Sequence, residues 1–143
     1  MKTIMIAALS ILASVAAAAA QTAPDLKGVW SGRVRTVIYG QNPHHPGPSD
    51  QNTPRIREIT YTYDFEGQDG QLLWGKSWSS PDQKEPFAAM IAPDGKTIFG
   101  ADTDGSLAIT IAAPDRLDLC YTHSALSPTK SIVASCGSLQ RSK

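Results

Sequence analysis

Beyond residue 25 the 143-residue chain lacks any stretch with a sustained helical period and any apolar run long enough to cross a bilayer. Neither sign of charge is in excess, with 13 basic and 13 acidic residues, which argues against nucleic acid or an anionic membrane surface as a partner. There is no Gly-x-Ser-x-Gly motif, no pair of histidines spaced along a strand and no clear Ser/His/Asp set. We therefore expect neither a membrane anchor nor a familiar catalytic site.

The first twenty residues are typical of a cleavable secretory signal. Lys2 provides a basic start, residues 3–16 are mostly apolar, and small residues follow up to Ala20. The alternative is a membrane anchor, but the apolar stretch is short, and no cysteine near Ala20 could carry a lipid. We expect cleavage after Ala20, so that residues 21–143 form a single soluble domain that is secreted or periplasmic.

Turn-forming residues divide the remaining chain into short segments in which apolar and polar residues alternate. Pro-Asp pairs at Pro81, Pro93 and Pro114 mark three of the breaks, because proline presets the backbone for the second turn position. Residues 40–55 carry four prolines and are expected to form a long loop. Such short strands and connections predict an all-β fold, either an eight-stranded antiparallel up-and-down β-barrel or a sandwich. The expected strands lie near residues 28–39, 56–66, 71–79, 87–92, 96–100, 106–112, 117–123 and 131–140.

Alternation assigns one face of each strand to the interior, as the wall of an antiparallel barrel requires. In the first strand, for example, Arg33 and Arg35 fall on the outer side. The expected inward residues in four of the strands are Trp30, Val34, Thr36 and Ile38; Ile59, Tyr61, Tyr63 and Phe65; Leu107, Ile109 and Ile111; and Leu117, Leu119 and Tyr121.

The two cysteines, Cys120 and Cys136, are expected to form a disulfide, because cysteines in an exported chain are more often bonded than free. If the last two strands form a hairpin with Cys120 opposite Cys136, then Asp118 faces Ser138 and both sulfur atoms lie on the outer face. This arrangement predicts a structural cross-link between neighbouring strands rather than a redox or metal site.

Gly28 and Trp30 at the head of the first strand, followed by an eight-strand meander, resemble the calycin superfamily of lipocalins and avidins. In that superfamily the tryptophan plugs the base of the barrel and an arginine from the end of the chain packs across it. The resemblance implies that Arg141, which shares a side with Val133 and Leu139, contacts Trp30 through a cation–π interaction. We therefore favour the barrel, with Gly28, Trp30 and Arg141 as structural residues.

Trp74, Lys76 and Trp78 share one face of the third expected strand. If this face points into the lumen, Lys76 needs an anionic or carbonyl partner, and the two indoles supply stacking surface for a small ligand. If it points outward, the lysine stem lies over exposed rings and the interior receives Leu73, Gly75 and Ser77. We favour the inward orientation.

The spacing of Trp74 and Trp78 also resembles the third strand of avidins. Two positions depart from the avidin pattern: Gly32 stands where avidins carry a hydrogen-bonding Asn, and Thr36 stands where they carry a Ser. No tryptophan follows Trp78 to supply their later indoles. We therefore expect a small apolar or anionic ligand other than biotin, and no cofactor.

His44 and His45 lie in the proline-rich loop, with Asp50 nearby. Adjacent histidines reach one metal ion only in a bent loop, and a third ligand fixed by the scaffold is usually required. We therefore expect no metal site there. The resemblance to lipocalins implies that residues 40–55 form a lid over the open end of the barrel; alternatively, they form a loop that binds a partner.

The segment 102–105 has the acidic residues of half a calcium loop but lacks the spaced ligands and the terminal glutamate. A tight turn between strands is the prediction. His123 is expected on the inward side of the seventh strand, close to its end. There it either contacts a ligand or acts as a hydrogen-bonded residue at the rim.

Three functions compete on this basis. The first is an exported, non-catalytic barrel that binds a small molecule, and the second is an exported protein-binding module, such as an enzyme inhibitor acting through its loops. An enzyme with His123 and a tyrosine as acid–base pair ranks last. An open, aromatic-lined lumen favours the first function and a filled lumen favours the second. The candidate ligand-binding residues are Tyr61, Tyr63, Trp74, Lys76, Trp78 and His123.

Overall fold

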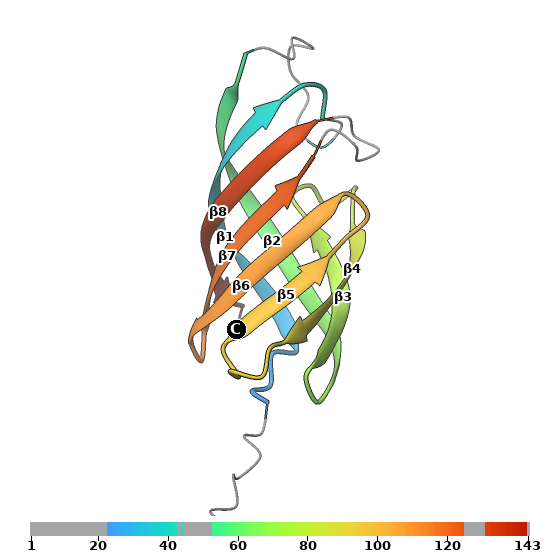
Figure 1. Cartoon of the computed structure of the whole chain (residues 1–143), viewed down its shortest axis with the longest axis vertical. Coiled ribbons are helices and arrows are strands. Elements are labelled where there is room, and N and C mark those ends of the chain that lie inside the picture. Colours follow the sequence, from blue (N-terminus) through green and yellow to red (C-terminus); the bar gives the residue numbers. More distant parts are fainter. Residues whose placement is uncertain (1–22, 43, 45–52, 125–130, 143) are drawn as a thin grey trace, which may run out of the picture.

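Eight antiparallel strands enclose a barrel in the computed structural model of the chain, which describes residues 23–42, 44, 53–124 and 131–142 (Figure 1). Each strand pairs with the next, and β8 pairs with β1, so that the barrel is closed. No helix in these residues is long and apolar enough to cross a membrane. The strands are β1 (Gly28–Tyr39), β2 (Arg55–Asp69), β3 (Leu72–Trp78), β4 (Glu85–Ile91), β5 (Thr97–Ala101), β6 (Gly105–Ala113), β7 (Arg116–His123) and β8 (Ile132–Arg141).

The eight expected strands are confirmed, and the pairing of β1 with β8 excludes the sandwich. The largest difference lies in β2, which continues past Phe65 to Asp69 through a β-bulge between Asp64 and Gly67. The expected signal segment and most of the 40–55 loop, including His45 and Asp50, lie outside the described residues.

The up-and-down topology gives the barrel two chemically different ends. Because successive strands run in opposite directions, the connections β1–β2, β3–β4, β5–β6 and β7–β8 lie at one end, which we call the open end. The chain enters β1 and leaves β8 at the opposite end, the plugged end, which is the lower end in Figure 1.

Trp30 closes the plugged end. Its side chain is fully buried, and its Nε1–H donates to the backbone oxygen of Leu26 over 2.9 Å. The guanidinium carbon of Arg141 lies 4.6 Å from the centre of the indole ring, and the same guanidinium donates to the backbone oxygen of Asp25. Gly28 has a φ of 113°, a conformation open to glycine but costly for other residues. The expected contact between Trp30 and Arg141 is therefore confirmed.

Aromatic rings fill the lumen above this plug. The ring centres of Tyr63 and Phe65 each lie 5.2 Å from that of Phe87, in edge-on contacts. Tyr61 lies 5.5 Å from Tyr63 and continues the stack toward the open end. The inward residues expected in β1, β2, β6 and β7 are buried or half-buried, as alternation predicted.

A disulfide joins β7 and β8 on the outer face. Cys120 lies directly opposite Cys136, with Asp118 opposite Ser138. The Cα atoms of the two cysteines are 4.2 Å apart, and both residues are exposed. The predicted pairing, register and face are confirmed.

The expected orientation of β3 is wrong. Trp74 is 47% exposed and Lys76 is also exposed, whereas Leu73, Gly75 and Ser77 face the interior. Two contacts explain the reversal: the Trp74 ring lies over Gly67, where a Cβ atom would be 2.2 Å from the ring, and Lys76 pairs with Glu66 across 3.4 Å.

Trp78 is half-buried at the end of β3, with the ammonium of Lys84 4.4 Å above its ring. It contributes to the outer surface together with Trp74 and Lys76. The three residues therefore form no pocket inside the barrel, and the ligand contacts assigned to them there are withdrawn.

Candidate functional site

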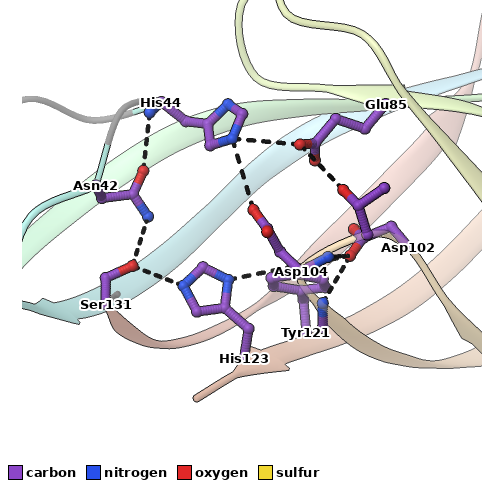
Figure 2. A network of polar contacts seen from close by, with 10 residues as sticks. Asn42, His44, Glu85, Asp102, Asp104, Tyr121, His123 and Ser131 are labelled. Carbon is purple, nitrogen blue, oxygen red and sulfur yellow. Dashed lines mark hydrogen bonds and ion pairs between the residues drawn. The ribbon is translucent and has the colours of Figure 1, made fainter. Parts of the chain in front are cut away.

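Polar side chains from three connections and from the ends of β4 and β7 meet at the open end (Figure 2). They surround a cavity of about 30 Å³, which has room for about two water molecules. Pockets that hold drug-sized ligands are at least tenfold larger, at roughly 300–1,000 Å³. The lumen is therefore almost filled by its own side chains. Residues on the cavity wall include His44, Tyr61, Glu85, Asp104, Tyr121 and His123.

The β5–β6 connection is a tight turn that places Asp104 at this wall. The Oδ1 atom of Asp102 accepts hydrogen bonds from the backbone N–H of Asp104, over 3.0 Å, and of Gly105, over 2.8 Å. The backbone N–H of Asp102 donates to the oxygen of Gly105 and closes the turn. The prediction of a turn in residues 102–105 is confirmed.

Three ionisable side chains converge beside the cavity. The Nε2 atom of His44 lies 3.4 Å from Oε1 of Glu85 and 3.7 Å from Oδ2 of Asp104. The Asp104 side chain is only 5% exposed. Burial raises the pKa of Glu85; the charges of Asp104 and Asp102 raise it further, whereas His44 lowers it.

His44 is held in place through its backbone. Its N–H donates to Oδ1 of Asn42 over 2.9 Å, and the amide nitrogen of Asn42 donates to Oγ of Ser131 over 3.1 Å. Asn42 and Ser131 are both buried. The chain that follows β1 is therefore tied to the residue that precedes β8, and His44 is held over the rim of the barrel.

His123 occupies the centre of a directional chain of hydrogen bonds. Tyr121 donates its hydroxyl proton to Oδ1 of Asp102 over 3.1 Å, so its oxygen can only accept from Nδ1 of His123, 3.3 Å away. Nδ1 therefore carries the imidazole proton, and Nε2 accepts from Ser131 over 2.8 Å. Burial lowers the pKa of His123, which keeps this neutral tautomer.

The structure brings together only part of the predicted ligand-binding set. Tyr61 and His123 line the cavity, and His123 is also the hydrogen-bonded rim residue that was expected. Tyr63 points inward as predicted but is fully buried against Phe65 and Phe87, away from the cavity wall.

Sequence reasoning missed Glu85 and Asp104 as site residues. It left the first without a role and treated the second as part of a turn. A signal was available, because the meander places the connections before Glu85 and around Asp104 at the same end as His44. The carboxylates beside His44 thus come from distant segments and not from its own loop.

The electrostatics of this end are acidic. Within the described ranges, no lysine or arginine is ion-paired with Glu85, Asp102 or Asp104; only His44 reaches two of these carboxylates. Burial also raises the pKa of the Tyr61 and Tyr121 hydroxyls, with a contribution from Asp102, so both stay protonated. The arrangement suits a cation or a ligand rich in hydrogen-bond donors, and it disfavours an anion.

No family model and no curated protein matches the chain. Among solved structures it is similar to the S-type phycobiliprotein lyase CPES from Guillardia theta, with 13% sequence identity and a TM-score of 0.37 over 82% of this chain and 89% of the lyase chain. These values are too low to carry an argument about ligand or activity. The closed eight-stranded barrel, plugged by Trp30 and Arg141, fits a calycin-like fold on its own geometry.

Proposed function

We propose that the protein is an exported, non-catalytic barrel that binds a small polar or cationic ligand at its open end. The observation that carries the proposal is the convergence of His44, Glu85 and Asp104 on a small cavity at the end opposite the Trp30 plug. A calycin-like barrel with one closed end offers a ligand a single way in.

The volume of the cavity and the charge of its wall restrict the class of ligand that can bind. The cavity of about 30 Å³ is too small for a sizeable apolar molecule. The carboxylates of Glu85 and Asp104 oppose the anionic ligand expected from the sequence, since Lys76 lies on the outer face. The ligand is therefore small and carries positive charge or several donors.

The state of the rim residues supports binding without catalysis. Both ring nitrogens of His123 are engaged, by Tyr121 and Ser131, so neither is free to take a proton from a substrate. The raised pKa of the Tyr121 hydroxyl makes it a poor acid at neutral pH.

Export is supported by the signal-like segment 1–20 and by the disulfide between Cys120 and Cys136, a bond that persists in oxidising compartments. The nearly filled lumen favours the alternative expected from the sequence, a protein-binding module acting through residues 40–55. That alternative stays a prediction, because most of the loop lies outside the described residues.

Native mass spectrometry tests the proposal on protein purified from its own secretory pathway, with a denatured aliquot as reference. We expect extra mass that disappears on denaturation and is lost in Glu85→Gln. The Lys76→Gln variant, which alters the outer face, serves as the matched control and keeps the extra mass. Wild-type protein without extra mass, or extra mass retained in Glu85→Gln, contradicts the proposal.

A further inference from the structure

We propose that His44, Glu85 and Asp104 form a binding site for a divalent transition-metal cation, with Zn²⁺ as the representative ion. This inference rests on the proposed function and names the ligand class of the same site. His44 and Asp104 come from two separate connections at the open end and Glu85 from the first position of β4, and only the closed barrel brings the three side chains together.

The spacing of the three ligand atoms fits a metal ion. All of them lie within 4.8 Å of one another, with 3.4 Å from His44 Nε2 to Glu85 Oε1 and 3.7 Å to Asp104 Oδ2. A tetrahedral ion with bonds of about 2.1 Å holds neighbouring ligand atoms about 3.4 Å apart. The two distances from His44 Nε2 are therefore within a few tenths of an ångström of this spacing, whereas the two carboxylate oxygens, which lie within 4.8 Å of each other, have to move closer by up to about 1.4 Å.

The charge balance also points to a cation. His44, if protonated, supplies one positive charge against the two carboxylates that it contacts. Asp102 adds a third acidic group in the same turn as Asp104, and its Oδ2 atom is buried. Since the Asp104 side chain is only 5% exposed, water compensates its charge poorly. A divalent ion between Glu85 and Asp104 neutralises both and leaves the imidazole free to coordinate.

Neighbouring residues hold the three ligand side chains in position before an ion binds. Asn42 fixes the backbone of His44, Thr103 donates to Oε1 of Glu85 over 3.4 Å, and the Asp102 turn fixes Asp104. Outer-shell contacts of this kind keep metal ligands oriented before the ion arrives. With three protein ligands, the remaining coordination position opens toward the cavity and admits water or a small ligand.

The donor set selects among divalent cations. One imidazole and two carboxylates suit Zn²⁺ and its first-row neighbours, whereas Ca²⁺ prefers six to eight oxygen ligands and Mg²⁺ keeps most of its water shell. Within the first row, affinity rises from Mn²⁺ to Cu²⁺ and is lower again at Zn²⁺. We expect Zn²⁺ to bind and Ca²⁺ or Mg²⁺ to compete poorly.

Isothermal titration of the chelator-treated full protein with ZnCl₂ tests the inference, with the bound metal counted by elemental analysis. We expect one ion per chain, and an affinity at least about 100-fold weaker in His44→Gln, Glu85→Gln and Asp104→Asn. The Asp94→Asn variant makes the same chemical change to an exposed carboxylate at the plugged end, and it should bind Zn²⁺ as the wild type does.

Thermal unfolding separates loss of the site from loss of the fold. Zn²⁺ should raise the melting temperature of the wild type and of Asp94→Asn, and leave that of a folded Asp104→Asn unchanged. Wild-type protein that binds no Zn²⁺, or ligand variants that bind it unchanged, overturn the inference. If native mass spectrometry then still shows a non-metal mass that depends on Glu85, the proposed function stands without the metal. If it shows neither, both proposals fail.

Discussion

Removal of the disulfide should lower the free energy of unfolding by about 3 kcal/mol, as the loop-closure entropy of a short ring predicts. Cys120 and Cys136 are separated by 16 positions, so the cross-link restricts only this segment of the unfolded chain. Both cysteines are exposed and opposed on the outer face, so replacing them with serine removes little packing. The loss should therefore come almost wholly from the cross-link.

The assay is equilibrium unfolding in urea, with oxidised wild type, reduced wild type and Cys120→Ser/Cys136→Ser measured side by side. A loss of about 3 kcal/mol corresponds to a fall of about 10 °C in melting temperature for a domain of this size. The slope of the unfolding free energy against urea should rise, because the unfolded chain without its cross-link exposes more surface.

Two results would refute this reasoning. The first is a loss below about 1 kcal/mol, which would mean that the β7–β8 hairpin persists in the unfolded state and already restricts the chain. The second is a difference between the reduced wild type and the serine variant, which would show that the substitutions disturb packing. The hairpin register should survive in either sample, since the strands pair along their whole length.

Three further changes probe the barrel wall, the plug and the rim. Gly75→Ala should cost about 3 kcal/mol in urea unfolding, because its Cβ would lie 1.8 Å from the backbone oxygen of Asp64. Arg141→Met should cost about 1 kcal/mol by the same assay, through loss of the cation–π contact with Trp30. Burial lowers the pKa of His123 below its usual 6.5, so the unfolded state takes up this proton first and stability should fall as the pH drops below 6.5. In His123→Gln, the free energy of unfolding, measured in urea at several pH values, should fall less steeply as the pH drops below 6.5.

The first two of these changes have matched controls. Gly70→Ala replaces a glycine with a φ of 55°, but its Cβ would meet no atom within 4 Å. It should lower the free energy of unfolding by only about 1 kcal/mol. An equal loss in Gly70→Ala and Gly75→Ala would refute the steric explanation for Gly75. Arg35→Met removes an exposed arginine from the outer face and should be nearly neutral. The raised pKa of Glu85 acts on the pH dependence of stability in the opposite direction to His123, because Glu85 takes up its proton more readily in the folded state than in the unfolded state. An unchanged slope in His123→Gln would show that other groups set the acid response.

The alternation of apolar and polar residues predicted most of the fold, because only one face of the barrel wall contacts solvent. In β2, Tyr61 and Tyr63 alternate with threonines, so a single register buries the tyrosine rings and places the threonines on the outer face. The Trp30–Arg141 contact was implied by the calycin resemblance, and it is possible because the first and last strands of a closed meander pair with each other.

The same reasoning failed at β3, where both faces carry large or ambiguous residues. Leu73 competes with Trp74, and the pairing of Ser77 with the inward Tyr63 turns Leu73 inward, while the β2 bulge places Gly67 rather than Glu66 beneath the Trp74 ring. Such a bulge leaves no distinct mark in the sequence.

The site was harder to predict because its residues are scattered. Glu85 and Asp104 each look like ordinary acidic residues next to a turn, and only the barrel topology relates them to His44. The Pro-rich segment around His44 also gave no indication that Asn42 would fix it to Ser131.

The position of the chain ends relative to the open end has a practical consequence. β1 begins and β8 ends at the plugged end, where Trp30 and Arg141 seal the barrel, whereas His44, Glu85 and Asp104 lie at the opposite end. A surface tether or fluorescent reporter fused after Arg141 would therefore leave the open end facing solution. The loops there could be exchanged for others without touching the strands that close the wall, which makes the barrel a scaffold for immobilised sensors.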